Sequence, residues 1–355
     1  VLASLFVFRA NYLASGNLQD LISLEEKKLE MDMVHFSPPP MTVLKAITSP
    51  FTAFLNPIFL DAHKIPRIPN KPLLFVSNHT IMGLDFPLLL TKLWGEHDIF
   101  LRALADHSHF QVPINAMIMR DVLGAVDGTR RNVDLLMDVN AKIFVYPGGA
   151  RETFKRTTDK KYEIIWGHRR GFAQMAIRHG CTIVPVTNYG TEDMVEVIGD
   201  LPLGWVPIPF LWNSDRTLPL MRVTGDVSSF SKGKVYFKFG EPIETEEMKG
   251  REMEEKVVSE IVNQTKNAIE NDLVFLKIYS ERKEKEEEEN RKREGRGGGG
   301  GWRGRLGNLG RMLRMRAAKE TGEIVGGELE ELERRAEKEE GDNVGEGTVA
   351  GKASL

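Results

Sequence analysis

A histidine and an aspartate in the first quarter of the chain are the residues best placed to do chemistry. His79 follows the apolar run 73–76, and Asp85 stands six residues later, just before a second apolar run. A neutral imidazole accepts a proton near physiological pH, and a carboxylate can orient it. The pair therefore suggests a general base with an orienting partner. The structural alternative is that Asp85 is simply the N-cap of a helix whose first turn contains Pro87.

A second group of polar residues follows another apolar run. Residues 146–152 read Tyr-Pro-Gly-Gly-Ala-Arg-Glu, so the run ends in a tight turn with two adjacent glycines and then a charged pair. Neighbouring glycines let a backbone approach a ligand closely and can direct N–H groups at an oxygen. Taken alone, the same residues also fit a plain β-turn.

These groups must be positioned by regular elements, and the chain between Thr42 and Tyr279 alternates strand and helix signals. The predicted strands are 73–77, 99–103, 142–146, 182–187 and 234–239, and the predicted helices are 86–94, 133–138, 171–179 and 252–277. Strands separated by helical stretches predict an α/β fold, with a mixed, mostly parallel sheet flanked by helices.

The composition sets bounds on the domain organisation. With 355 residues and 41% apolar content, the chain can bury one substantial core. We expect a membrane-proximal amphipathic segment over residues 1–41, a catalytic domain over 42–279, and a disordered tail over 280–355 that is charged and glycine-rich. The net charge of −3 gives no reason to expect nucleic acid as a partner, and the single cysteine, Cys181, fits a small core residue.

Membrane signals in the sequence are indirect. The stretch 43–62 is apolar but contains Pro50 and Pro57, which favours an interfacial helix, straight or broken, over a transmembrane one. The stretch 201–221 combines aromatic residues with prolines and is expected to be a loop that touches lipid. The basic segment 302–316 offers a weaker signal of the same kind. Ordinary burial inside the protein is the alternative for the first two stretches.

Four blocks in a fixed order resemble the phospholipid/glycerol acyltransferase superfamily. They are Asn78–Asp85, Gly124–Arg130, Tyr146–Glu152 and Ile183–Val186. The segments 102–107 and 166–174 resemble the mono/diacylglycerol acyltransferase-like branch, which includes the plant phytyl ester synthases. The resemblance covers about residues 42–277.

The resemblance implies a single acyltransferase domain that moves a fatty acyl group from a thioester, acyl-CoA, to a lipid hydroxyl. It implies His79 as general base and Asp85 as the group that holds its tautomer. The backbone N–H groups of Gly148 and Gly149 would stabilise the oxyanion, and Arg151 is the charged alternative or a contact for donor phosphates. The expected substrate-binding residues are Asn78, Tyr146, Pro147, Gly148, Gly149, Arg151 and Glu152.

Two departures from the lysophosphatidate-type pattern bear on the acceptor. Five residues separate His79 from Asp85 where that pattern has four, and Gly148 stands where it has glutamate. Both features favour a neutral acceptor such as mono- or diacylglycerol, with a lysophospholipid or phytol as alternatives. Two other readings remain open, a catalytically silent membrane protein that binds lipid and a hydrolase that uses water as acceptor.

The expected partners follow from this reading. The substrates are a fatty acyl thioester and a lipid alcohol, and the protein is expected at a membrane surface, in the endoplasmic reticulum or alternatively in a plastid. No cofactor is expected beyond acyl-CoA as co-substrate. No metal is expected either, because the histidines lack ligand spacing.

Overall fold

The computed structural model of the chain describes residues 27–68, 71–80, 83, 85–111, 113–155, 158–201, 218–223 and 234–296. Its contacts divide the chain into two units, Val1–Glu281 and Arg282–Leu355. The predicted boundaries at residues 41 and 279 remain predictions.

A seven-stranded sheet organises the described part of the first unit, in the order β1-β9-β6-β2-β5-β3-β4. Its strands are β1 (Pro57–Leu60), β2 (Leu73–Ser77), β3 (Leu101–Ala105), β4 (Val126–Asp127), β5 (Lys142–Val145), β6 (Thr182–Tyr189) and β9 (Val235–Phe239). The central strand β2 is parallel to both neighbours, β5 and β6, and β3 and β4 continue in the same direction. Only β9 and β1 run the other way. The predicted mixed, mostly parallel sheet is confirmed.

The central strands form where the sequence is apolar without alternation. All five residues of β2 and all eight of β6 are buried, as expected for strands with helices on both faces. The two faces bury different side chains. Leu74 and Val76 of β2 belong to one hydrophobic cluster, whereas Leu73 and Phe75 belong to the other.

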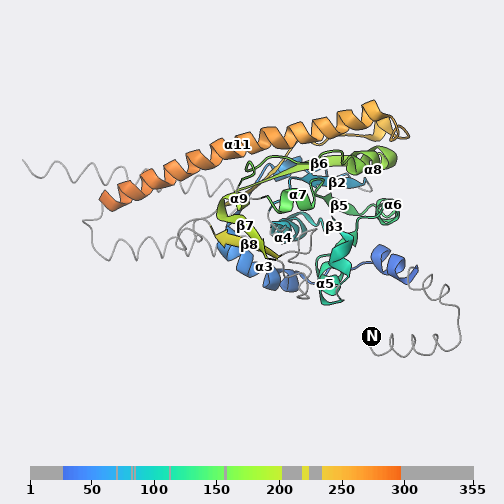
Figure 1. Cartoon of the computed structure of the whole chain (residues 1–355), viewed down its shortest axis with the longest axis horizontal. Helices are drawn as coiled ribbons and strands as arrows, with labels where there is room; N and C mark the ends of the chain where they lie inside the picture. The colour runs from blue at the N-terminus through green and yellow to red at the C-terminus, as the bar shows by residue number, and fades with distance from the viewer. Residues whose placement is uncertain are drawn as a thin grey trace, which may run out of the picture. The chain divides into compact units, whose positions relative to one another are not determined.

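Helices cover both faces of the sheet. Helix α8 (Gly171–His179), helix α6 (Arg130–Asp138) and the first part of α11 (Glu255–Arg296) pack in the first cluster. Helices α3 (Met41–Leu55) and α4 (Phe86–His97) pack in the second, on the opposite side in Figure 1. The short elements are η1 (Ala62–Lys64), η3 (His107–Phe110), α5 (Pro113–Met117), the π-helical turn η4 (Ile118–Val122), α7 (Ala150–Thr153), α9 (Thr191–Met194) and η6 (Glu246–Met248).

The stretch 43–62 is divided between a helix and a strand. Helix α3 ends at Leu55, Asn56 adopts a left-handed conformation, and β1 then joins the edge of the sheet. The buried side chain of Leu44 and the exposed ones of Val43 and Ile47 give the helix one face in the core and one outside. No helix among the described residues is long and apolar enough to cross a membrane.

Two other predicted segments need correction or fall outside the description. Of the expected aromatic loop 201–221, residues 202–217 lie outside the described part, but Leu218–Val223 forms β8, which pairs antiparallel with β7 (Val195–Leu201). The helix predicted to end at 277 continues to Arg296, because the charge run supplies pairs such as Lys283 with Glu286 one helical turn apart. Residues 1–26 and 297–355 are not described.

Candidate active site

The predicted chemical groups lie together at the carboxyl ends of the central strands of the sheet. Asn78 and His79 come directly after β2, and Tyr146 comes directly after β5. These strands are parallel neighbours, with Val76 paired to Val145, so their carboxyl ends meet. This is the edge where parallel sheets with helical crossovers carry their ligand sites. Residues almost seventy positions apart in the sequence are therefore brought into contact.

The imidazole of His79 has a defined tautomer. Its Nδ1 atom lies 2.9 Å from the carbonyl oxygen of Thr80. Because a carbonyl oxygen can only accept a hydrogen bond, the ring proton sits on Nδ1 and the lone pair remains on Nε2. The local backbone thus gives this ring the protonation pattern that a general base needs.

The environment keeps that ring neutral. Burial lowers the pKa of His79 from 6.5 to about 4, opposed by the Thr80 carbonyl and reinforced by the charges of His109 and Lys155. At neutral pH the imidazole is therefore the free base. The residue as a whole is half-buried rather than fully enclosed.

Asp85 does not have the position that the sequence suggested. Its carboxylate accepts hydrogen bonds from the hydroxyl of Thr80 and, at 2.8 Å, from the hydroxyl of Tyr146. Among the described residues no hydrogen bond joins it to His79, so the expected direct orienting contact is wrong. Asp85 stands at the N-cap position of α4, but its side chain forms no capping hydrogen bond there. Burial raises the pKa of its carboxyl group, and the two hydroxyl donors oppose that shift.

Tyr146 connects the two ionisable residues instead. Its ring stacks on the imidazole of His79 with centroids 4.0 Å apart and planes inclined by 21°, while its hydroxyl holds Asp85. Burial beside Asp85 raises the pKa of the phenol well above its usual value of 10.0, so Tyr146 remains a donor. The described contacts therefore link Asp85 to His79 through Tyr146 and Thr80.

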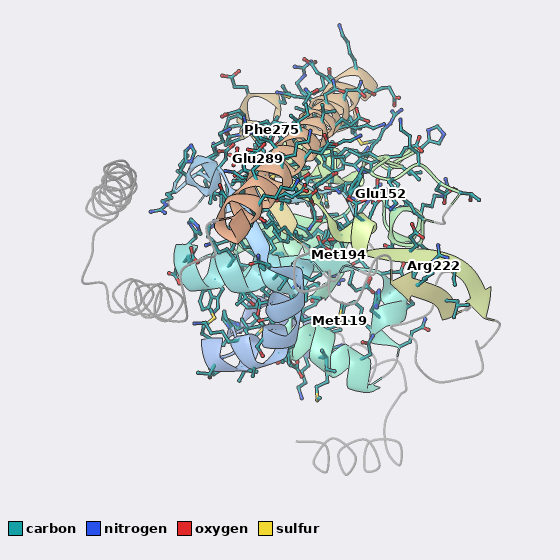
Figure 2. All side chains as sticks on the ribbon, turned by 90° about the vertical axis from the view of Figure 1, so that its left-hand side faces the viewer. Met119, Glu152, Met194, Arg222, Phe275 and Glu289 are labelled. Carbon is teal, nitrogen blue, oxygen red and sulfur yellow. The ribbon has the colours of Figure 1, made fainter. Side chains whose placement is uncertain are left out.

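Glu152 supports the backbone of the site. Its carboxylate accepts the N–H of His79 at 2.8 Å and that of Ile165 at 2.6 Å. The residue is only 1% exposed, and Figure 2 places it within the body of the domain. Burial raises its pKa, and the two N–H donors oppose the shift. The expected role of Glu152 in substrate binding is corrected, because both of its oxygens hold protein backbone.

The glycine turn is shaped around that carboxylate. A Cβ atom at Gly148 would overlap the carboxyl group of Glu152, so a larger residue there would displace that carboxyl group. Gly149 has a φ of +50°, and its N–H already donates to the Tyr146 carbonyl at 3.2 Å. The carbonyls of Pro147 and Gly148 accept hydrogen bonds from Arg169. Gly149 is thus an unsuitable oxyanion donor, contrary to expectation.

Asn78 is likewise a structural residue rather than a substrate contact. Its side-chain amide donates to the carbonyl of Asn188 and accepts from the N–H of the same residue, both at 2.9 Å. It is 3% exposed and joins the ends of β2 and β6. The expected role of Asn78 in substrate binding is corrected for that reason.

Arg151 is the predicted residue that remains available to a ligand. Its side chain is exposed, one residue past the start of α7. Within the described part of the chain it forms no ion pair or hydrogen bond. A free guanidinium beside the glycine turn has the chemistry to bind a phosphate group of an acyl donor.

A buried ion pair behind the site escaped the sequence analysis. Lys155 and Glu192 are joined at 2.8 Å, with side chains 7% and 4% exposed. The second oxygen of Glu192 accepts the N–H of Tyr162 at 2.7 Å. No spacing in the sequence signals this pair, because its members lie 37 positions apart. Thr80 could have been noticed, since it adjoins His79, but its hydroxyl and carbonyl roles depend on the turn.

The block Gly124–Arg130 has structural tasks in this fold. It contains β4, at the edge of the sheet, and Thr129 caps α6 by accepting the N–H of Asn132 at 3.2 Å. Asp127 pairs with the exposed His107 at 2.7 Å. Over the described residues, no group of three His, Cys, Asp or Glu side chains is arranged to hold a metal ion.

Comparison with known proteins finds a matching family model and several similar enzymes. Residues 59–188 match the family model described as Acyltransferase. Phytyl ester synthase 2, chloroplastic, of Arabidopsis thaliana is 25% identical over 242 residues, which are 59% of this chain and 33% of that protein. The human DGAT1/2-independent enzyme synthesizing storage lipids is 30% identical over 140 residues, 39% of this chain and 42% of that protein.

Among solved structures, the chain is similar to a 1-acyl-sn-glycerophosphate (LPA) acyltransferase, PlsC, from Thermotoga maritima. It is 17% identical with a TM-score of 0.37, over 64% of this chain and 78% of that one. This chain spans about a third of the length of the plant synthases that it matches.

Proposed function

We propose that the chain, whose residues 59–188 match the family model described as Acyltransferase, transfers a fatty acyl group from acyl-CoA to the hydroxyl of a neutral lipid. The observation that carries the proposal is the state of His79. Its proton is fixed on Nδ1 by the Thr80 carbonyl and its ring is kept neutral by burial, so Nε2 can accept a proton.

The reaction follows from that geometry. The acceptor hydroxyl oxygen attacks the thioester carbonyl, a C–O bond forms, and Nε2 of His79 takes the hydroxyl proton. The carbonyl electron pair moves onto oxygen and gives an oxyanion. When the C–O double bond re-forms, the C–S bond breaks, and the thiolate receives the proton from His79. A base of this kind contributes about 10²–10⁴-fold to the rate. No enzyme nucleophile is needed, because the thioester is already activated.

Tyr146 and Asp85 would support the protonated intermediate. As His79 gains a proton, the electron-rich face of the stacked Tyr146 ring attracts the imidazolium. The hydrogen bond that the Tyr146 hydroxyl donates to Asp85 increases the electron density of that ring. Asp85 is thus proposed as a positioning residue that acts through Tyr146.

The proposed acceptor is mono- or diacylglycerol rather than a lysophospholipid. The Glu152 carboxyl group fills the space next to Gly148, so the turn itself has no room for a phosphate group of the acceptor. A neutral glycerol ester does not need that room. Phytol shares this property and is the second candidate acceptor, favoured by the similarity to phytyl ester synthases.

A membrane surface is the proposed location of the reaction. Val43 and Ile47 are 40% and 38% exposed and lie one turn apart on α3, where they can enter the interface. Flotation with liposomes should be weaker for the V43S/I47S double variant than for wild type. Equal flotation would refute this contact. We propose the endoplasmic reticulum as the compartment, with a plastid as the alternative, and imaging of the tagged full-length protein distinguishes the two.

Labelled acyl-CoA and a panel of acceptors test the function. Wild type should esterify diacylglycerol or monoacylglycerol faster than lysophosphatidate, and His79→Ala should lose almost all product. His107→Gln is the matched control, because that histidine is exposed and its ring pairs with Asp127. Equal product from wild type and His79→Ala would refute the base. Binding of lipid without any product from wild type would favour a silent lipid-binding protein.

A further inference from the structure

A second histidine lies at the same edge of the sheet as His79. His109 belongs to η3, which begins two residues after the end of β3. Strand β3 is the parallel neighbour of β5, with Ala103 paired to Phe144. The segments that follow β2, β5 and β3 therefore lie in sequence along one edge. They bring His79, Tyr146 and His109 to the same end of the domain.

The backbone of His109 is held on both sides. Its N–H donates to the Asp106 carbonyl at 3.0 Å, and its own carbonyl accepts the side-chain amide of Asn115 at 2.7 Å. Asn115 is itself buried, at 7% exposure. These contacts fix the backbone position of His109, and a fixed backbone is one condition for a preorganised ligand contact.

The ring of His109 is held but unused. Its Nδ1 atom is shielded from solvent and has no hydrogen-bond partner within the described part of the chain. A buried polar atom without a partner is costly, and such atoms in folded proteins call for an explanation. A ligand that enters the site and forms a hydrogen bond with the ring would supply one.

His109 is also electrostatically coupled to His79. A positive charge on His109 lowers the pKa of His79, in line with the position of η3 at the same end of the sheet. Burial lowers the pKa of His109 itself, against the opposing charge of Asp106. The other charged group that acts on the His79 ring is Lys155, behind the site. Both imidazoles are therefore neutral at pH 7, and each retains one N–H and one lone pair.

The proposed reaction needs a hydrogen-bond donor at the attacked carbonyl oxygen, and some of the backbone donors around His79 are already engaged. Charge builds on the carbonyl oxygen of the thioester, and a fixed donor there is worth about 10²–10³-fold in kcat. The N–H of Gly149 is already used by the Tyr146 carbonyl, and that of His79 by Glu152. We propose that His109 contacts the substrate in this site and donates a ring N–H to the oxygen of the attacked carbonyl. This inference rests on the proposed acyl transfer.

Two substitutions at position 109 separate donation from mere packing. His109→Gln keeps an N–H donor on a side chain of similar reach, whereas His109→Leu keeps bulk without a donor. We expect His109→Leu to lower kcat by about 10²–10³-fold with little change in KM for the acyl donor, and His109→Gln to recover part of that loss. His107→Gln, two residues earlier and exposed, should match wild type.

The pH profile gives an independent readout. Without the charge of His109, the pKa of His79 should rise, so the acid limb of kcat/KM should move to higher pH in both position-109 variants. Urea unfolding of each variant shows whether the fold is kept. Equal kcat in folded His109→Leu and wild type would overturn the inference, as would equal losses in Leu and Gln. Absence of acyl transfer by wild type would instead overturn the proposed function.

Discussion

Replacing Glu152 by glutamine should weaken the fold and the reaction together. The carboxylate accepts the backbone N–H of His79 and that of Ile165, and it is almost fully buried. Glutamine has nearly the same shape, but only one of its two terminal atoms can accept a hydrogen bond. One of the two N–H groups must therefore face an NH₂ group, and it is left buried without a partner.

The size of the effect follows from these two contacts. An unsatisfied buried donor costs about 1–3 kcal/mol, so the free energy of unfolding should fall by that amount. If the lost contact is the N–H of His79, the imidazole moves with its backbone. A misplacement of about 1 Å at a reacting group costs on the order of 100-fold in rate. We expect kcat to fall by up to that factor while KM changes little.

Urea unfolding and steady-state acyl transfer measure the two quantities, and Thr245→Val is the matched control. The hydroxyl of Thr245 donates to the carbonyls of Ala176 and Cys181, at 2.7 Å each. These groups lie beside the amino end of β6, whereas His79 follows the carboxyl end of the parallel strand β2. Loss of the Thr245 hydroxyl should lower stability by about 1–3 kcal/mol and leave kcat unchanged in the folded protein. If Glu152→Gln matched wild type in both quantities, the reasoning about this carboxylate would be refuted.

Three further predictions concern the same site. Tyr146→Phe keeps the ring that stacks on His79 but removes the hydrogen bond to Asp85, so kcat should fall by about 10-fold while circular dichroism stays native; an unchanged kcat would exclude the role of that bond. Gly148→Ala forces a methyl group into the Glu152 carboxyl, and urea unfolding should show a loss of about 1–3 kcal/mol, whereas an unchanged midpoint would contradict the close contact. Between pH 6.5 and about 4, His79 is protonated in the unfolded chain but remains neutral in the folded protein. The contribution of His79 to the free energy of unfolding therefore falls as the pH falls through this range. The difference in the free energy of unfolding between wild type and His79→Gln, measured against pH, isolates that contribution, which is about 3 kcal/mol at most. If the two curves were parallel, the shifted pKa would be contradicted.

Much of the fold could be read from local patterns. The predicted strand 73–77 and the predicted helix 171–179 coincide with β2 and α8 at both ends. Both were predicted from local sequence, since an unbroken apolar run indicates a buried strand and Gly180 ends the helix. The division of 43–62 into α3 and β1 was not foreseen. That division depends on the left-handed turn at Asn56 and on β9 being present as a partner for β1.

The site was predicted in its membership more than in its contacts. The spacing from His79 to Asp85 and the glycine turn correctly indicated the carboxyl ends of the central strands, since both groups follow strands that are parallel neighbours. The assignment of a direct contact between the two residues failed. The hydroxyl of Thr80 and the phenol of Tyr146 compete for the same carboxylate, and Tyr146 comes from another strand.

The sequence by itself determined the kinds of groups that this protein brings to its chemistry, namely an imidazole, a buried carboxylate, a glycine turn and an arginine. Their types, order and spacing are properties of the chain. Only the tertiary structure decided which of them touch. The tautomer of His79 depends on a carbonyl and its placement on an N–H, and every residue has both groups, so neither partner can be read from residue types. Glu152 and Asn78 changed from expected ligand contacts to supports for the same reason, because their partners are backbone atoms that only the folded sheet brings within reach.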